Sequence, residues 1–179
     1  MDCIERTLRD NRMLTVRRGH PDDAQATLDH LAAVYAESNF LTRGPANFEA
    51  SLSAQHDFIA AHTGASLKLF LVGLVEGNLV GTLTFSGRTL PRVRHTGEFG
   101  MAVRQAVSGF GVGSTLLDFL IAWTRATGVI TKLNLRVRSD NERAIRLYQR
   151  KGFVLEGTIS REHLIDGRYF SQDCMGLQL

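Results

Sequence analysis

Apolar residues recur along this chain at two different spacings, which predict helices in some segments and strands in others. Helical spacing runs from His20 to about Ser38, from Phe48 to His62, and again over 114–127 and 139–152. Alternating or dense apolar runs predict strands, and Gly77-Asn78 turns the chain between two of them. The predicted strands cover residues 14–18, 67–75, 79–85, 95–103, 133–137, 153–162 and 169–177. Helices mixed with hairpins in this order favour an α+β fold with a largely antiparallel sheet.

The 179 residues contain no repeat, low-complexity stretch or linker, so we expect one domain over residues 14–179. Residues 1–13 are polar and lack the apolar core of a signal peptide, and we expect them to form a poorly ordered leader. No apolar run approaches the roughly 20 residues that cross a bilayer. The two cysteines, Cys3 and Cys174, fit free thiols in a reducing compartment. These features predict a cytoplasmic protein.

The composition, 44% hydrophobic and 22% charged, is that of a globular protein and argues against disorder. A formal charge of +3 is a mild excess, compatible with an anionic small molecule as ligand. Lysines and arginines are scattered, apart from Arg17-Arg18 and the alternating Arg136 and Arg138, which disfavours nucleic-acid binding. The histidines show no metal-ligand spacing, so we predict no metal site.

A glycine-rich turn, Gly109-Phe110-Gly111-Val112-Gly113, lies between a predicted strand and a predicted helix. Glycines let the backbone approach phosphate oxygens, and a helix start offers unpaired N–H groups and a positive dipole end. The turn lacks the Gly-Lys-Ser/Thr ending of a P-loop and the GxGxxG order of a dinucleotide site. By itself it predicts either an anion site or merely a tight strand-to-helix turn.

A second motif follows about 30 residues downstream, Asn141-Glu-Arg-Ala-Ile-Arg-Leu-Tyr148 and then Gly152-Phe153. The two motifs in this order resemble the GNAT superfamily of N-acetyltransferases. The stretch 157–175 resembles its branch of ribosomal-protein N-terminal acetylases and small-amine or amino-acid acetylases. The resemblance implies a twisted, mostly antiparallel sheet of about seven strands with about four flanking helices, splayed open where acetyl-coenzyme A binds. It also implies an acyltransferase with an amine acceptor, in a superfamily where homodimers are common.

The resemblance further implies which residues contact the coenzyme. Amides of the strand before the turn would pair with the pantetheine arm, the turn would hold the pyrophosphate, and the second motif would reach the pantetheine and the sulfur. In chain order this set is Met101, Ala102, Val103, Gly109, Gly111, Gly113, Ser114, Asn141 and Tyr148. The chain departs from the family at Ser108, where an Arg or Gln is usual, and Arg104 or Gln105 could take over that contact.

Acetyl transfer from a thioester to an amine needs a base for the ammonium group and a proton for the departing thiolate. Glu98 resembles the family's glutamate base, although many relatives place it one position further from the turn, so a bulge would have to absorb the slip. A solvated edge carboxylate is the alternative for Glu98, and His95 is a second candidate base. Tyr148 is the expected general acid, because a tyrosine of pKa about 10 keeps its proton at neutral pH. A backbone N–H near Met101 or Ala102 would meet the oxyanion.

The acceptor is less constrained by the sequence. Tyr35, Phe40 and Phe48 fall where the family binds acceptors, but core packing explains them equally well. We expect a primary amine of a small molecule, because no charged stripe indicates a peptide track. The alternatives are a protein N-terminal acetyltransferase and a coenzyme-binding sensor without catalysis.

Overall fold

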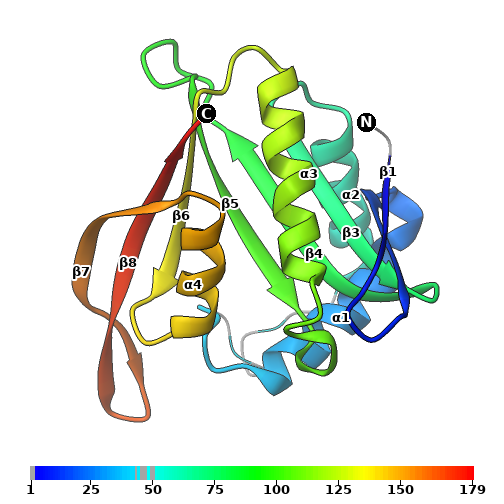
Figure 1. Cartoon of the computed structure of the whole chain (residues 1–179), viewed down its shortest axis with the longest axis horizontal. Coiled ribbons are helices and arrows are strands. Elements are labelled where there is room, and N and C mark those ends of the chain that lie inside the picture. Colours follow the sequence, from blue (N-terminus) through cyan, green and yellow to red (C-terminus); the bar gives the residue numbers. More distant parts are fainter. Residues whose placement is uncertain (1–2, 43, 45–47, 49–50) are drawn as a thin grey trace.

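The computed structural model describes residues 3–42, 44, 48 and 51–179, and within them eight strands form one sheet (Figure 1). The strands are β1 (Cys3–Thr7), β2 (Met13–Arg18), β3 (Lys68–Val75), β4 (Asn78–Gly87), β5 (Thr96–Val103), β6 (Lys132–Arg138), β7 (Val154–Ile165) and β8 (Arg168–Gln178). The α-helices are α1 (Ala24–Glu37), α2 (Leu52–Thr63), α3 (Val112–Ala126) and α4 (Glu142–Arg150).

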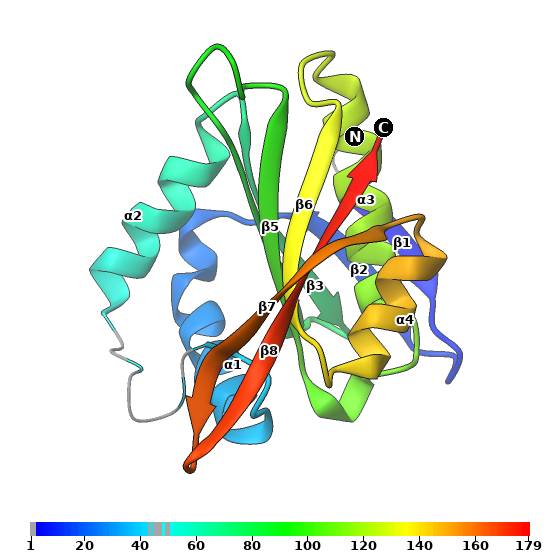
Figure 2. The ribbon, with the colours of Figure 1, turned by 90° about the vertical axis from the view of Figure 1, so that its left-hand side faces the viewer.

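The strand order is β1-β2-β3-β4-β5-β6-β8-β7, and every neighbouring pair is antiparallel except β5 and β6. Helices α1 and α2 cover one face of the sheet, and α3 and α4 cover the other (Figure 2). The predicted α+β class and largely antiparallel sheet are therefore confirmed. None of the helices in the described ranges combines the length and apolar content needed to cross a membrane.

The main hydrophobic core lies between the sheet and α3. Leu116, Leu117, Phe119 and Leu120 of α3 are fully buried and form the apolar stripe that the helical spacing predicted. A smaller cluster on the opposite face joins α1 and α2 to β3 through Ala24, Ile59, Phe70 and Val72. Gly128, with a φ of 64°, follows α3 in the left-handed conformation that commonly ends a helix.

The sheet has one strand more than the predicted count of about seven, and that strand lies in the segment predicted to be a leader. β1 pairs with β2 from Cys3↔Arg17 to Thr7↔Met13. Ile4 packs against the core, and Leu8, just after β1, is only 3% exposed. Arg6 occupies the position between these two apolar residues, so the run is too sparse to show the apolar alternation that revealed the other strands. We infer that core packing anchors this edge strand.

The sheet splits between β5 and β6. These strands pair only from Thr96↔Lys132 to Glu98↔Asn134, whereas β5 pairs with β4 and β6 with β8 along their lengths. Beyond Glu98 the two strands diverge, which leaves one backbone edge of residues 99–103 without a strand partner. Unpaired N–H and C=O groups at such an edge can pair with an extended ligand.

We predict that Leu8→Ala lowers the free energy of unfolding by about 2–4 kcal/mol, because it removes a buried side chain from the core. The matched control is Met13→Ala in the same hairpin, where the side chain is 48% exposed and the cost should stay below about 1 kcal/mol. Urea denaturation of both variants measures the difference. Equal small effects would contradict packing of this segment onto the core.

Candidate active site

A cleft of about 1390 Å³ opens where β5 and β6 separate. It is lined by the free edge of β5, the glycine turn, the start of α3 and one side of α4. All residues predicted to contact the coenzyme line this cleft, and the sheet split therefore brings together segments almost 50 positions apart. The set in the lining is Met101, Ala102, Val103, Gly109, Gly111, Gly113, Ser114, Asn141 and Tyr148.

The glycine turn adopts a backbone conformation that other residues rarely reach. Gly109 and Gly111 have φ angles of 96° and 122°. Gly111 directly precedes α3, and its carbonyl accepts the hydrogen bond of the Thr115 amide at 3.0 Å. The amides of residues 112–114 therefore start the helix without partners within it. A helix start at a cleft wall is a site for an anion.

An arginine that the sequence analysis missed lies directly over this turn. A Cβ atom placed on Gly109 would be 2.8 Å from Nη2 of Arg143, so the guanidinium of α4 packs onto the glycine backbone. Arg104 is engaged elsewhere, because its Nη2 lies 2.6 Å from Oε1 of Glu37. The hydrogen bond from Arg104 also lowers the pKa of Glu37, which accepts the Gln105 amide as well. Arg143 thus places a cation at Gly109, next to the position where Ser108 departs from the family.

Asn141 has a structural role in this wall of the cleft. Its Oδ1 accepts a hydrogen bond from the Ala144 amide at 3.2 Å and caps the start of α4. Asn141 also lines the cleft, and its side-chain NH2 group is a further hydrogen-bond donor. The cap fixes the first turn of the helix that carries Arg143 and Tyr148.

Tyr148 is buried in the cleft wall, with 7% of its surface exposed. Its ring packs against Phe99 of β5 and Phe153 beside β7, at centroid distances of 6.0 and 5.9 Å. Burial raises the pKa of Tyr148 to about 12, because the phenolate is poorly solvated there. The hydroxyl therefore stays protonated throughout the physiological range.

Glu98 does not line the cleft. β4 and β5 keep a regular register, with Glu98 opposite Ser86, so no bulge shifts its side chain. Successive strand residues face opposite sides, and Glu98 therefore lies on the α1/α2 face while Phe99 meets Tyr148 on the other. There Glu98 and His95 line a second pocket of about 330 Å³. Arg136 lines both cavities, and its Nε is 3.6 Å from Oε1 of Glu98.

The aromatic residues predicted near the acceptor are separated in the structure. Phe40 lines the large cleft, whereas Tyr35 and Phe48 pack on each other with ring centroids 5.3 Å apart. Arg138 lies between the rings of Phe40 and Phe170, at 4.9 and 3.9 Å, and donates to Asp140 and to the Asn39 carbonyl. It thus holds the end of the α1 segment at the cleft.

The described residues contain no cluster of three metal-ligating side chains.

Comparisons with known proteins agree with this architecture. A family model described as the acetyltransferase (GNAT) family matches residues 29–153. The chain is 34% identical over 103 residues to an L-amino acid N-acetyltransferase of Escherichia coli (strain K12), covering 55% of this chain and 61% of that protein. It is 32% identical over 126 residues to an N-alpha-acetyltransferase of Mycobacterium tuberculosis, covering 69% and 68%. The first match thus spans less than two thirds of its relative.

Among solved structures, an acetyltransferase of the GNAT family from Streptococcus pneumoniae superposes with a TM-score of 0.89 at 27% identity, covering 93% of this chain and 99% of that one. The family match includes the strand, glycine turn and helix that form the cleft. The chain belongs to the GNAT family of acetyltransferases.

Proposed function

We propose that this chain transfers the acetyl group of acetyl-coenzyme A to the primary amine of a small molecule. The observation that carries the proposal is the split beside β5, which combines a free strand edge, a glycine turn at a helix start and a buried tyrosine in one cleft. Residues 99–103, at about 3.3 Å each, give an edge roughly 16 Å long, suited to an extended pantetheine arm.

In this proposal the two ends of the cleft have different tasks. The amides of residues 112–114 and the Arg143 guanidinium hold the pyrophosphate, since both present N–H donors and positive charge at the turn. The free edge of β5 aligns the arm, and the Asn141 NH2 group donates to it. The thioester then lies toward Glu98, where β5 and β6 meet.

The chemistry requires a neutral amine and stabilisation of the leaving sulfur. Glu98 would take the proton of the ammonium group on the α1/α2 face, directly or through one water. Tyr148 would donate to the sulfur from the other face. Its pKa of about 12 lies well above the roughly 8.5 of an ordinary thiol, so the hydroxyl acts mainly as a hydrogen-bond donor to the thiolate.

The size and charge of the second pocket support a small acceptor. A pocket of about 330 Å³ is at the lower end of the range for small-molecule sites. Arg88, Lys132 and Arg136 in its lining disfavour a polycationic acceptor. The similarity to an N-alpha-acetyltransferase keeps a protein N-terminus as the competing acceptor, and a non-catalytic sensor as the third alternative.

Thiol release from acetyl-coenzyme A, measured with panels of amines, amino acids and peptides, separates these functions. We expect turnover with small amines. Turnover confined to peptides would instead indicate a protein acetyltransferase. Coenzyme A binding without release on any panel would indicate the sensor.

We predict that Tyr148→Phe lowers kcat by about 10²-fold and leaves the Kd of coenzyme A nearly unchanged, because only the hydroxyl is removed from a ring that stays packed. The raised pKa keeps the hydroxyl protonated, so ionisation of Tyr148 should cause no loss of wild-type rate below about pH 10. Steady-state kinetics from pH 6 to 10 measure both effects. An unaltered kcat in the variant would remove Tyr148 from the chemistry.

We predict that Arg143→Ala raises the Kd of coenzyme A by about 10- to 100-fold, through loss of a charge-assisted contact to the pyrophosphate. The matched control is Arg146→Ala on the same helix, because Arg146 is not part of the cleft lining and pairs with Glu142 at 2.8 Å. Calorimetry with coenzyme A and with pantetheine, which lacks the pyrophosphate, measures the contact. Equal weakening of both ligands would show that Arg143 acts on the fold of the site instead.

A further inference from the structure

The second pocket has charges of both signs on facing strands. Glu98 comes from β5, Arg136 and Lys132 from β6, and Glu156 from β7, while Arg88 enters from the β4–β5 connection. Lys132 and Glu156 pair tightly at 2.8 Å and neutralise one another. This leaves Glu98, Arg136 and Arg88 as the charges of the lining outside that pair, with an excess of one positive charge.

The Glu98–Arg136 pair is built loosely. Its N–O distance of 3.6 Å is longer than that of the Lys132–Glu156 pair, and the two side chains are 44% and 51% exposed. Such an exposed pair contributes little to stability, so a ligand can separate its members at small cost. A ligand that brings an ammonium group for Glu98 and an anion for Arg136 would replace the pair by two charge-assisted contacts.

The pocket opens toward the place where acetyl transfer would occur. Glu98 is the last residue of β5 that pairs with β6, and the next residue, Phe99, lines the coenzyme cleft. Arg136 lines both cavities. An amine on Glu98 would therefore lie in the second pocket, next to the inner end of the cleft, and an anion on Arg136 would lie between the two cavities.

We propose that the acceptor is a free α-amino acid, whose ammonium group meets Glu98 and whose carboxylate binds the Arg136 guanidinium. This inference rests on the proposed function and specifies its substrate class. An arginine fork matches a carboxylate in a bidentate manner, and an α-amino acid carries both charges on one carbon. A peptide N-terminus lacks that carboxylate, and a plain amine would add a positive charge to the pocket without bringing an anion for Arg136. Val93 of the β4–β5 connection also lines this pocket and offers an apolar contact to the amino acid's side chain.

The test compares L-leucine, L-leucinamide and 3-methylbutylamine, which share a side chain and differ at the carboxylate. We expect the wild type to prefer leucine over leucinamide in kcat/KM, and Arg136→Gln to lower that ratio by about 10- to 100-fold. Because ratios are compared between variants at one pH, the different basicities of the two amines cancel. Arg136→Lys should retain part of the preference.

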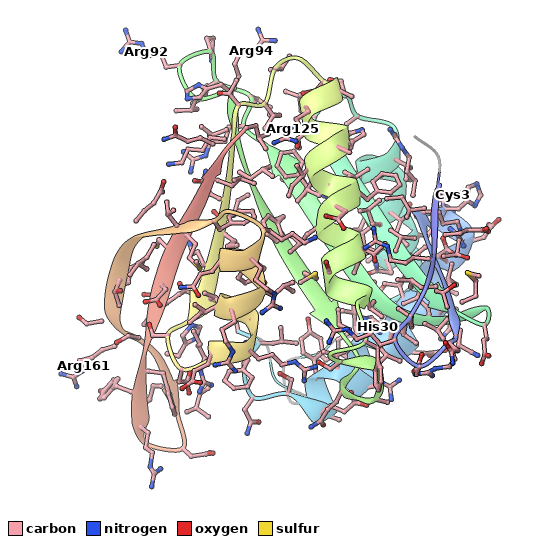
Figure 3. The ribbon with its side chains drawn as sticks, viewed as in Figure 1. Cys3, His30, Arg92, Arg94, Arg125 and Arg161 are labelled. Carbon is pink, nitrogen blue, oxygen red and sulfur yellow. The ribbon has the colours of Figure 1, made fainter. Side chains whose placement is uncertain are left out.

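The matched control is Arg94→Gln, which removes a charge from the nearby β4–β5 connection outside the pocket lining (Figure 3). It should keep the wild-type ratio. The Kd of coenzyme A, measured by calorimetry, verifies that each variant is folded. Two results would overturn the amino-acid assignment: equal turnover of leucine and leucinamide by the wild type, or an undiminished preference for leucine in Arg136→Gln. Neither result would contradict the proposed acetyl transfer. Coenzyme binding with no transfer to any amine would overturn the proposed function as well.

Discussion

Strands β5 and β6 share a register over only three residue pairs, and the cleft exists because they share no more. The separation is held open from within. On the α3/α4 side, Met101 of β5 and Leu147 of α4 both approach the backbone of Gly113 at the start of α3. The two helices therefore pack against each other and against β5 at the split. The exposed edge of β5 leaves hydrogen-bonding groups that water or a ligand must satisfy. An extended ligand with its own amides recovers those bonds, which is why a structural gap can serve as a binding site.

The split also separates the two halves of the proposed chemistry. Glu98 lies on the α1/α2 face and Tyr148 on the α3/α4 face, with the gap between them. A nucleophile must approach a thioester carbonyl while the sulfur departs in another direction, and groups on opposite faces can serve the two without competing. Had Glu98 shared a face with Tyr148, its charge would have lain beside the buried hydroxyl and opposed the developing thiolate. The β4–β5 register is regular, so the bulge that would have absorbed the slip at Glu98 is absent, and the two side chains stay on opposite faces.

Local pattern was enough to predict most of the fold. Spacing of 3.6 and 2 residues identified the four helices and seven of the strands, and the paired glycine and Asn–Tyr motifs identified segments that line the cleft. What could not be predicted depends on contacts between distant segments. β1 is anchored by Ile4 and Leu8, which are too few apolar residues to reveal a strand from the sequence. From the sequence, Arg143 is one of several charged residues on a helix, and only the structure shows that it packs on the turn at Gly109. The pairing of Glu98 with Arg136 could not be predicted either, because it depends on β5 and β6 being neighbours in the sheet, and these strands are separated in the sequence by α3.

The burial of Tyr148 links the stability of the fold to its chemistry. Its ring joins Phe99 and Phe153 in one cluster, so β5, α4 and the start of β7 pack together at the side of the split. The same burial raises the pKa of the hydroxyl to about 12 and keeps its proton in place. If α4 moved away from Phe99, water would reach the phenol and its pKa would fall toward the ordinary value near 10. The contacts that pack α4 against the sheet are therefore the contacts that raise the pKa of Tyr148. A substitution at Phe99 would change both the packing and the pKa.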